Sequence, residues 1–182
     1  MIKLVLDIPD IVEKIMPTSV KVDGQDKPVY FIDGTPYEVI HTLVEKDASE
    51  SFKFKKYPLI ILFHDITQVV EPRPGVWADL MLNLAIVNYT EREYTSKQRR
   101  EVNYKPILRP IYKDVINAFE KSPFFMGFTD SYRHQMTERM FWGRKTMYGN
   151  EGEILNDHLD GIDIENLKLS LDKKTCEKWL IN

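Results

Sequence analysis

The clearest hydrophobic pattern in the chain lies between residues 76 and 87, where alternate side chains are apolar. One face of this stretch would carry Val76, Ala78, Leu80, Leu82, Leu84 and Ile86. The other face would carry Trp77, Asp79, Met81, Asn83, Ala85 and Val87. A period of two predicts a β-strand, and at about 3.3 Å per residue it would be roughly 40 Å long. Because a solvated face seldom carries tryptophan, methionine and valine together, we expect something to cover the mixed face as well.

Four further segments predict strands, at residues 28–32, 57–63, 139–148 and 162–171. Residues 57–63 are apolar without alternation, which is typical of a strand covered on both faces. Residues 64–75 contain Pro72-Arg73-Pro74-Gly75, so we expect a long extended connection that forms the tip of a hairpin. The alternation of the last strand slips at Glu165-Asn166, which predicts a β-bulge.

Three segments have helical spacing. Residues 8–16 form a short amphipathic helix that ends at Pro17, and Thr35-Pro36-Tyr37-Glu38 predicts a capped helix start that continues to about Lys46. The main helix lies within residues 94–122, with a cap at Thr95 or Ser96. Its apolar stripe is Leu108, Ile111, Tyr112, Val115, Ile116 and Phe119.

Two prolines lie inside that long helical segment. Pro106 and Pro110 each lack a backbone donor and restrict the preceding residue, so we expect them to break the run. Residues 97–100 would then be a polar arm outside the main helix. Residues 47–56 are expected to be a linker, and residues 172–182 a tail that docks as a final turn.

The order of these elements predicts an α+β fold, a mainly antiparallel sheet with helices packed on one face. We expect a single domain over residues 1–182. Within it, residues 1–50 form an N-terminal helix and strand region, residues 57–171 the core sheet and main helix, and residues 172–182 the tail.

Composition narrows the class of protein. The 182 residues are 43% hydrophobic, which is enough to bury a core, and the net charge of -3 argues against a general nucleic-acid binder. A single cysteine, Cys176, excludes an internal disulfide and a cysteine-rich metal site. No apolar run approaches the roughly 18 residues of a membrane span. The first apolar stretch is too short for a secretory signal, because the acidic Asp7 already interrupts it. We therefore expect a soluble protein of a reducing compartment.

The sequence offers little catalytic chemistry. The four histidines lack zinc-binding spacing, and no nucleophile or phosphate-binding motif is present. Asp157, Asp160, Asp163 and Glu165 surround Gly161 at a spacing that does not fit a calcium loop, so we expect a solvated turn there. The basic residues between 92 and 109 alternate with glutamates, which favours a solvated or subunit-contacting face over a nucleic-acid contact. We expect no metal and no cofactor.

Four segments together resemble the head–tail joining proteins of tailed bacteriophages, particularly the tail-terminator (tail-completion, neck) proteins. These segments are Tyr57–Phe63, Val76–Val87, Tyr104–Tyr112 and Leu159–Leu167. The resemblance lies in the order of elements and their apolar texture, not in catalytic residues. It implies a small α+β virion subunit that assembles, commonly six-fold, into a ring between the tail tube and the head connector. It also implies assembly in the bacterial host cytoplasm, and a conduit through which DNA passes without specific binding.

A ring requires surfaces that copies bury against each other. Exposed apolar patches and unpaired strand edges are the features that mark such surfaces. The candidate interface residues are Trp77, Asp79, Met81 and Asn83 on the mixed strand face, Val69, Val70 and Arg73 at the hairpin tip, and Phe124, Phe125 and Phe128 in an aromatic loop.

Two other functions stay open at this point. The first is a small metal-dependent nuclease that uses Asp65, Glu71 or Asp79, although these acids have no recognisable spacing. The second is an adaptor that binds another protein without assembling with itself.

Overall fold

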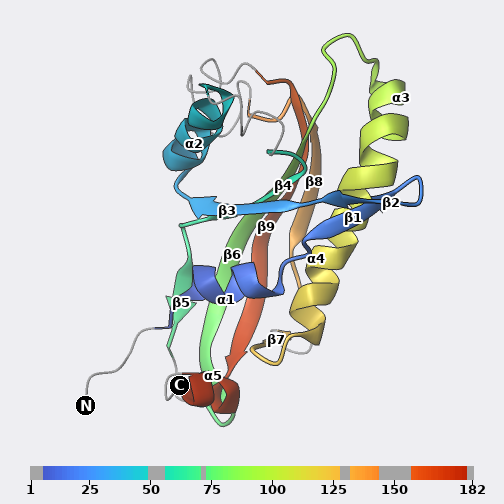
Figure 1. The fold of residues 1–182 in the computed structure, drawn as a ribbon. Coiled ribbons are helices and arrows are strands. Elements are labelled where there is room, and N and C mark those ends of the chain that lie inside the picture. Colours follow the sequence, from blue (N-terminus) through green and yellow to red (C-terminus); the bar gives the residue numbers. More distant parts are fainter. Residues whose placement is uncertain (1–5, 49–55, 71–72, 128–131, 144–156, 180–182) are drawn as a thin grey trace.

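The chain forms an α+β fold, which confirms the predicted class, with long paired strands at its centre and helices beside them (Figure 1). The computed structural model describes residues 6–48, 56–70, 73–127, 132–143 and 157–179. Within these ranges no helix has both the length and the apolar character that crossing a bilayer requires.

A seven-stranded sheet organises the molecule. Its central strands β6 and β9 are antiparallel to each other, and each has two shorter strands along its other edge. Along β6 these are β4 and β5, and along β9 they are β8 and β7; β3 extends the sheet beyond β4 in the parallel direction. The strands are β3 (Tyr30–Gly34), β4 (Leu59–Phe63), β5 (Thr67–Val69), β6 (Val76–Tyr89), β7 (Phe125–Gly127), β8 (Gln135–Met140) and β9 (Leu159–Asp172).

The predicted long strand and the predicted bulge are both confirmed. Leu82 lies opposite Leu167 and Leu84 opposite Ile164, so two residues of β9 face one residue of β6 between these pairs. The two residues of this bulge are Glu165 and Asn166, which lie opposite Asn83, and Asn166 has a φ of 56°. Asparagine tolerates this left-handed conformation better than most residues, so the sequence itself favours a bulge here.

A continuous helical segment lies against the sheet from residue 96 to residue 121. It comprises α3 (Ser96–Arg99), a π-helical stretch η1 (Arg100–Leu108) and α4 (Arg109–Lys121). The expected break of the helical run is wrong, because the helix continues through Pro106, and Pro110 lies in the first turn of α4. In η1 the backbone bonds reach one residue further back, as the Arg109 N–H bond to the Tyr104 carbonyl shows. The wider helix accommodates the prolines without ending.

Four other helical and hairpin elements complete the fold. They are α1 (Ile8–Ile15), α2 (Pro36–Ala48), α5 (Lys173–Trp179) and the separate hairpin of β1 (Ser19–Val22) with β2 (Gln25–Pro28). The ends of α1 and α2 agree with the predictions, and Thr35 and Glu38 form the expected capping box at the start of α2. The tail forms α5, and residues 180–182 lie outside the described residues.

The two faces of the sheet are covered differently. The main core lies between one face and the helices α1, η1 and α4, and includes Leu80 and Leu82 of β6 and Val115 of α4. The second face has a smaller core under α2, where Leu43 packs with Ile61 of β4 and Val87 of β6. Thus most helices share one face, as predicted, while α2 packs on the opposite face.

Two predicted strands have different bounds. The strand expected at 28–32 begins only at Tyr30, because Pro28 ends β2 and the chain then turns toward β4. The strand expected at 139–148 is wrong in position: β8 ends at Met140, and Phe141 has a φ of 58° that reverses the chain. Residues 144–148, and residues 49–55 of the expected linker, lie outside the described residues.

Candidate functional site

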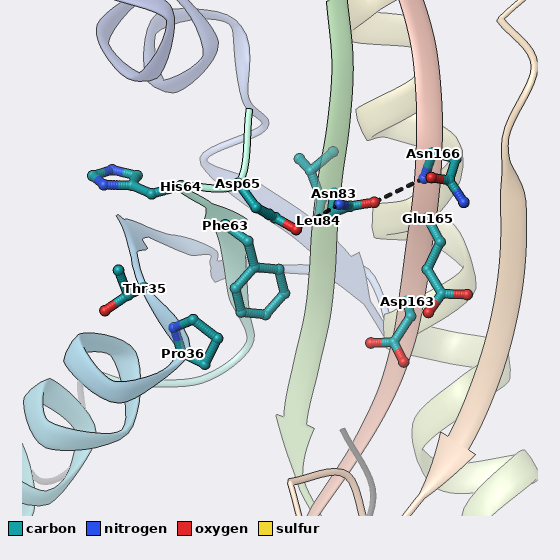
Figure 2. A pocket seen from close by; sticks show the side chains of 10 residues that line it. All are labelled: Thr35, Pro36, Phe63, His64, Asp65, Asn83, Leu84, Asp163, Glu165 and Asn166. Atoms are coloured by element: carbon teal, nitrogen blue, oxygen red, sulfur yellow. Dashed lines mark hydrogen bonds between the residues drawn. The ribbon is translucent and has the colours of Figure 1, made fainter. Parts of the chain in front are cut away.

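A pocket of about 600 Å³ opens on the face of the sheet that carries α2 (Figure 2). Its walls come from the start of α2, the end of β4, the middle of β6 and the bulge of β9. The lining residues are Thr35, Pro36, Phe63, His64, Asp65, Asn83, Leu84, Asp163, Glu165 and Asn166. The lining therefore combines apolar residues with carboxylates, amides, one hydroxyl and one imidazole.

Asn83 holds the centre of this pocket together. Its side-chain N–H donates to Asp65 Oδ2 at 2.9 Å, and its Oδ1 accepts from the Asn166 backbone N–H at 2.8 Å (Figure 2). One side chain of β6 thus connects the segment after β4 to the bulge of β9. The mixed face of the long strand uses its asparagine for contacts within the chain.

Asp163 forms a buried acidic floor. Its carboxylate accepts from Trp142 Nε1 at 2.8 Å and from Arg139 Nε, and Glu165 lies 3.8 Å from Arg139 Nη2. One arginine therefore faces two carboxylates, and Asp65 adds a third acidic group across the pocket. The pocket is acidic overall.

At the opposite rim, Asp33 and His64 are paired at 2.5 Å between the carboxylate and Nε2. Both side chains are more than a third exposed. Beside them, the Thr35 backbone N–H donates to Glu38, and this hydrogen bond lowers the pKa of the Glu38 carboxyl. These groups fix the entry to α2.

The residues proposed for a nuclease are not brought together. Asp65 lines the pocket. Asp79 lies on β6 four residues before Asn83, where it accepts from Ser170 Oγ at 2.5 Å and pairs with Arg73. Glu71 lies outside the described residues. Within the described ranges, no three or more His, Cys, Asp or Glu side chains are grouped so as to hold a metal ion.

The candidate interface residues occupy three kinds of position. Asp79, Met81 and Asn83 are half-buried on the second face of β6, beyond the part that α2 covers. Val69 and Val70 are 47% and 63% exposed beside them, and Arg73 is exposed at the end of the same hairpin. The predicted hairpin between residues 64 and 75 is confirmed by the pairing of β5 with β6.

The aromatic candidates lie closer to the core. Trp77 and Phe124 are half-buried and pack against the main core. Phe125 is only 3% exposed and meets Phe119 edge to face, so its side chain belongs to the interior. Phe128 lies outside the described residues.

Sequence reasoning missed a buried ionic cluster on the other face of the sheet. Arg99 and Asp160 are 1% and 0% exposed, and Arg99 Nη1 donates to Asp160 Oδ1 at 2.8 Å. The remaining donors of Arg99 reach Thr90 Oγ1 and the carbonyls of Glu91, Arg92 and Tyr94. The Phe141 ring covers the guanidinium at 3.9 Å, and Asn103 donates to Asp160 Oδ2.

Two expectations are corrected by this cluster. The segment expected as a polar arm contains a fully buried arginine, and the expected solvated turn around Gly161 is instead the buried start of β9, with Asp160 and Asp163 inside. A signal did exist in the sequence. Steps of four residues back from Phe119 reach Val115, Ile111, Ile107, Asn103 and Arg99, and all are buried. The buried face of the helix therefore continues from apolar residues into Asn103 and Arg99, whose polar groups are hydrogen-bonded.

Cys176 is buried in the main core on α5. Burial raises the pKa of its thiol to about 11, so the thiolate needed for nucleophilic chemistry is scarce at neutral pH. The expectation of a spare thiol without a catalytic role stays a prediction.

Comparison with protein-family models and with curated proteins finds no match for this chain.

Proposed function

We propose that this chain is a structural subunit of the neck of a tailed bacteriophage, a tail-terminator protein that forms a ring between the tail tube and the head connector. The proposal combines the resemblance of the apolar segments to that family with one structural observation. This observation is the part of the sheet between β5, β6 and β9, below α2, where exposed and half-buried side chains remain on the second face.

We call this area the lower sheet face. It consists of Thr67 and Val69 of β5, Asp79 and Met81 of β6, and Lys168 and Ser170 of β9. These residues lie opposite one another in register and share the face that α2 covers only further along. Within this area Thr67 and Val69 are exposed and Met81 is half-buried, whereas Ser170 is only 5% exposed.

The lower sheet face has a mixed character that suits contact with another copy. Val69 and Met81 supply apolar area, and the neighbouring Val70 is the most exposed aliphatic side chain among the described residues. Asp79 already bonds both Arg73 and Ser170, so these polar groups can be covered without losing their partners. The surface available for such a contact is smaller than the sequence suggested, because the chain's own helices cover the regular apolar face of β6.

The wider role follows from the same proposal. The subunits would bury the lower sheet face in a six-fold ring, assemble in the bacterial host cytoplasm and remain in the virion. The net charge of -3 suits a conduit through which DNA passes without specific binding. The protein would act without a cofactor and without catalysis.

The test is the oligomeric state of the purified full chain, measured by native mass spectrometry and negative-stain microscopy. We expect a closed ring. In the double variant Val69→Lys with Met81→Lys, we expect monomers that unfold at nearly the same temperature as the starting protein. Tyr37→Lys is the matched control, because Tyr37 is 60% exposed on α2, outside the lower sheet face.

Other results would overturn the proposal in different ways. A chain that stays monomeric at high concentration and binds another protein would be an adaptor. Divalent-metal-dependent DNA cleavage that disappears in Asp65→Asn or Asp79→Asn would identify a nuclease. A ring unchanged by the double lysine variant would exclude the lower sheet face as its interface.

A further inference from the structure

We call the part of the sheet where residues 84–89 of β6 pair with residues 159–164 of β9 its upper half. The upper half ends in an open strand on each side. There, β3 pairs only with β4, and β8 pairs only with β9, within the part of the chain that the structure describes. The two strands are similar in length, with five residues in β3 and six in β8. An open edge presents unpaired backbone N–H and C=O groups that can pair with another strand.

Two backbone hydrogen bonds show which groups of β3 face outward. Tyr30 N–H donates to the Pro58 carbonyl, and His64 N–H donates to the Gly34 carbonyl. In a parallel ladder, alternate residues of one strand bond the same neighbour, so Tyr30 and Gly34 face β4. The backbone groups of Phe31 and Asp33 therefore point to the open edge.

We infer that β3 of one copy pairs with β8 of the next, so that the sheets of neighbouring subunits join head to tail; this rests on the proposed ring. Strand direction supports the pairing. Within one sheet β3 and β4 are parallel, and each of the steps from β4 to β6, β9 and β8 is antiparallel. Consequently β8 is antiparallel to β3. A head-to-tail contact keeps these directions and places the two edges in antiparallel register, the more stable ladder.

Side chains at the two edges also match. Phe31 of β3 packs toward the main core, on the face that carries α4. On β8, Met140 packs toward the same core and Met136 shares its face, with 43% of Met136 exposed. Joining the edges sets an aromatic ring beside methionine side chains, a favourable cross-strand contact.

Charged side chains on both edge strands have partners within the subunit, and on β3 the partner of Asp33 is His64. Natural edge strands are often protected by charged side chains that project from them. On β8, however, Glu138 is held by Arg109 of α4, with a 2.6 Å contact to its Nε, and Arg139 is held by Asp163. Their charges are therefore directed onto the subunit's own surface.

The proposed contact is of the type that forms rings. The two edges differ, so the contact is heterologous, and repetition of a heterologous contact gives a ring when the rotation closes. In addition, β5 lies along the same edge of β6 as β4, so Val69 is on the β3 side of the sheet. A neighbour attached at β3 lies on the side of the sheet where the lower sheet face begins.

The first experiment distinguishes head-to-tail pairing from two-fold pairing. Asp33→Cys and Met136→Cys are prepared as separate full-length variants, mixed, and treated with a short bismaleimide. Head-to-tail pairing predicts crosslinks between the two variants and almost none within either variant alone. Crosslinks within Asp33→Cys alone or Met136→Cys alone would overturn it in favour of a two-fold contact. The unmodified chain is the control, because its Cys176 is fully buried.

The second experiment removes a single backbone donor. Asp33→Pro deletes the outward N–H and the side chain, whereas Asp33→Ala deletes only the side chain and its pairing with His64. We expect Asp33→Pro to weaken subunit association about tenfold relative to Asp33→Ala, as loss of one main-chain hydrogen bond would. Thermal unfolding of the two monomers verifies that both variants fold.

The outcomes separate this inference from the proposed function. Rings that assemble equally well in Asp33→Pro and Asp33→Ala, without crosslinks between the mixed variants, would overturn strand pairing and leave the ring intact. Absence of any ring in the starting protein would overturn both.

Discussion

The upper and lower halves of the paired strands β6 and β9 have similar alternating sequences but very different surroundings. In the upper half both faces are covered: α2 and Trp142 lie over Ala85 and Val87, and the helices of the main core lie over Ile86 and Ile162. In the lower half helices cover the main-core face, and the second face is the lower sheet face, where Val69 is 47% exposed and Met81 is half-buried.

Polar groups differ between the halves in the same way. Asp160 and Asp163 of upper β9 are buried and bonded to arginine, tryptophan and asparagine side chains. In the lower half, Asp79 pairs with Arg73 near the surface. The comparison indicates that the second face of the sheet is tightly packed in the upper half and less so in the lower half, whereas the main core covers the first face in both.

The largest expected effect is at the buried ionic cluster. Arg99→Ala leaves Asp160 charged and buried without its main partner, so we expect the free energy of unfolding to fall by about 3–5 kcal/mol. Urea unfolding followed by circular dichroism measures this. Arg100→Ala is the matched control, because Arg100 is exposed and its loss should change stability by at most about 0.5 kcal/mol. Equal effects of the two substitutions would show that the cluster is not stabilising.

The second prediction compares how much the packing on the second face of the sheet stabilises each half. Leu43→Ala removes a fully buried contact between α2 and the upper sheet, and we expect a loss of about 2–5 kcal/mol. Met81→Ala in the lower half should cost about 1 kcal/mol or less, because Met81 is half-exposed in a single subunit. Both are measured on monomeric protein. A larger loss for Met81→Ala would show that the second face is packed as tightly at Met81 as under α2.

The smallest effect is expected at the lower end of β9. The Asp172 carboxylate accepts from the Thr175 backbone N–H at 2.7 Å and caps α5. This hydrogen bond lowers the pKa of the carboxyl below its usual 3.8, so its stabilisation is present at neutral pH and is lost as pH falls through the lower folded value. Asp172→Ala should cost about 1 kcal/mol at neutral pH.

The pH dependence provides the control for this last prediction. The difference in unfolding free energy between Asp172→Ala and the starting protein should shrink as the acid is titrated. A difference that persists unchanged in strong acid would show that the carboxylate charge is not what stabilises α5.

Particular residues show how far the sequence could be interpreted. The alternation from Val76 to Val87, the slip at Glu165-Asn166 and the capping box at Thr35 each predicted a local element that the structure contains. The prolines misled, because a π-helical stretch that places Pro106 inside a continuous helix depends on its packing against the hairpin and the sheet. Arg99 misled for a related reason: a charged residue is interpreted as exposed unless its partner is known, and Asp160 is 61 residues away.

The candidate site was predictable only in part. Asp65 and Asn83 were named from the sequence for separate roles, as a possible metal ligand and as an interface residue, yet they are joined by a hydrogen bond in one pocket. The contribution of Asp163 and Glu165 to that pocket depends on the bulge of β9 and its register with β6.

By itself, the sequence determined α1, α2, α4 and the long strands β6 and β9, because apolar periodicity and capping residues act over a few neighbouring positions. It also determined the α+β class, since the order of those elements allows few sheets. Only the tertiary structure decided which faces are covered and which charges are buried. These depend on long-range contacts, such as α2 over upper β6 and Arg99 against Asp160, whose free energy no local pattern encodes.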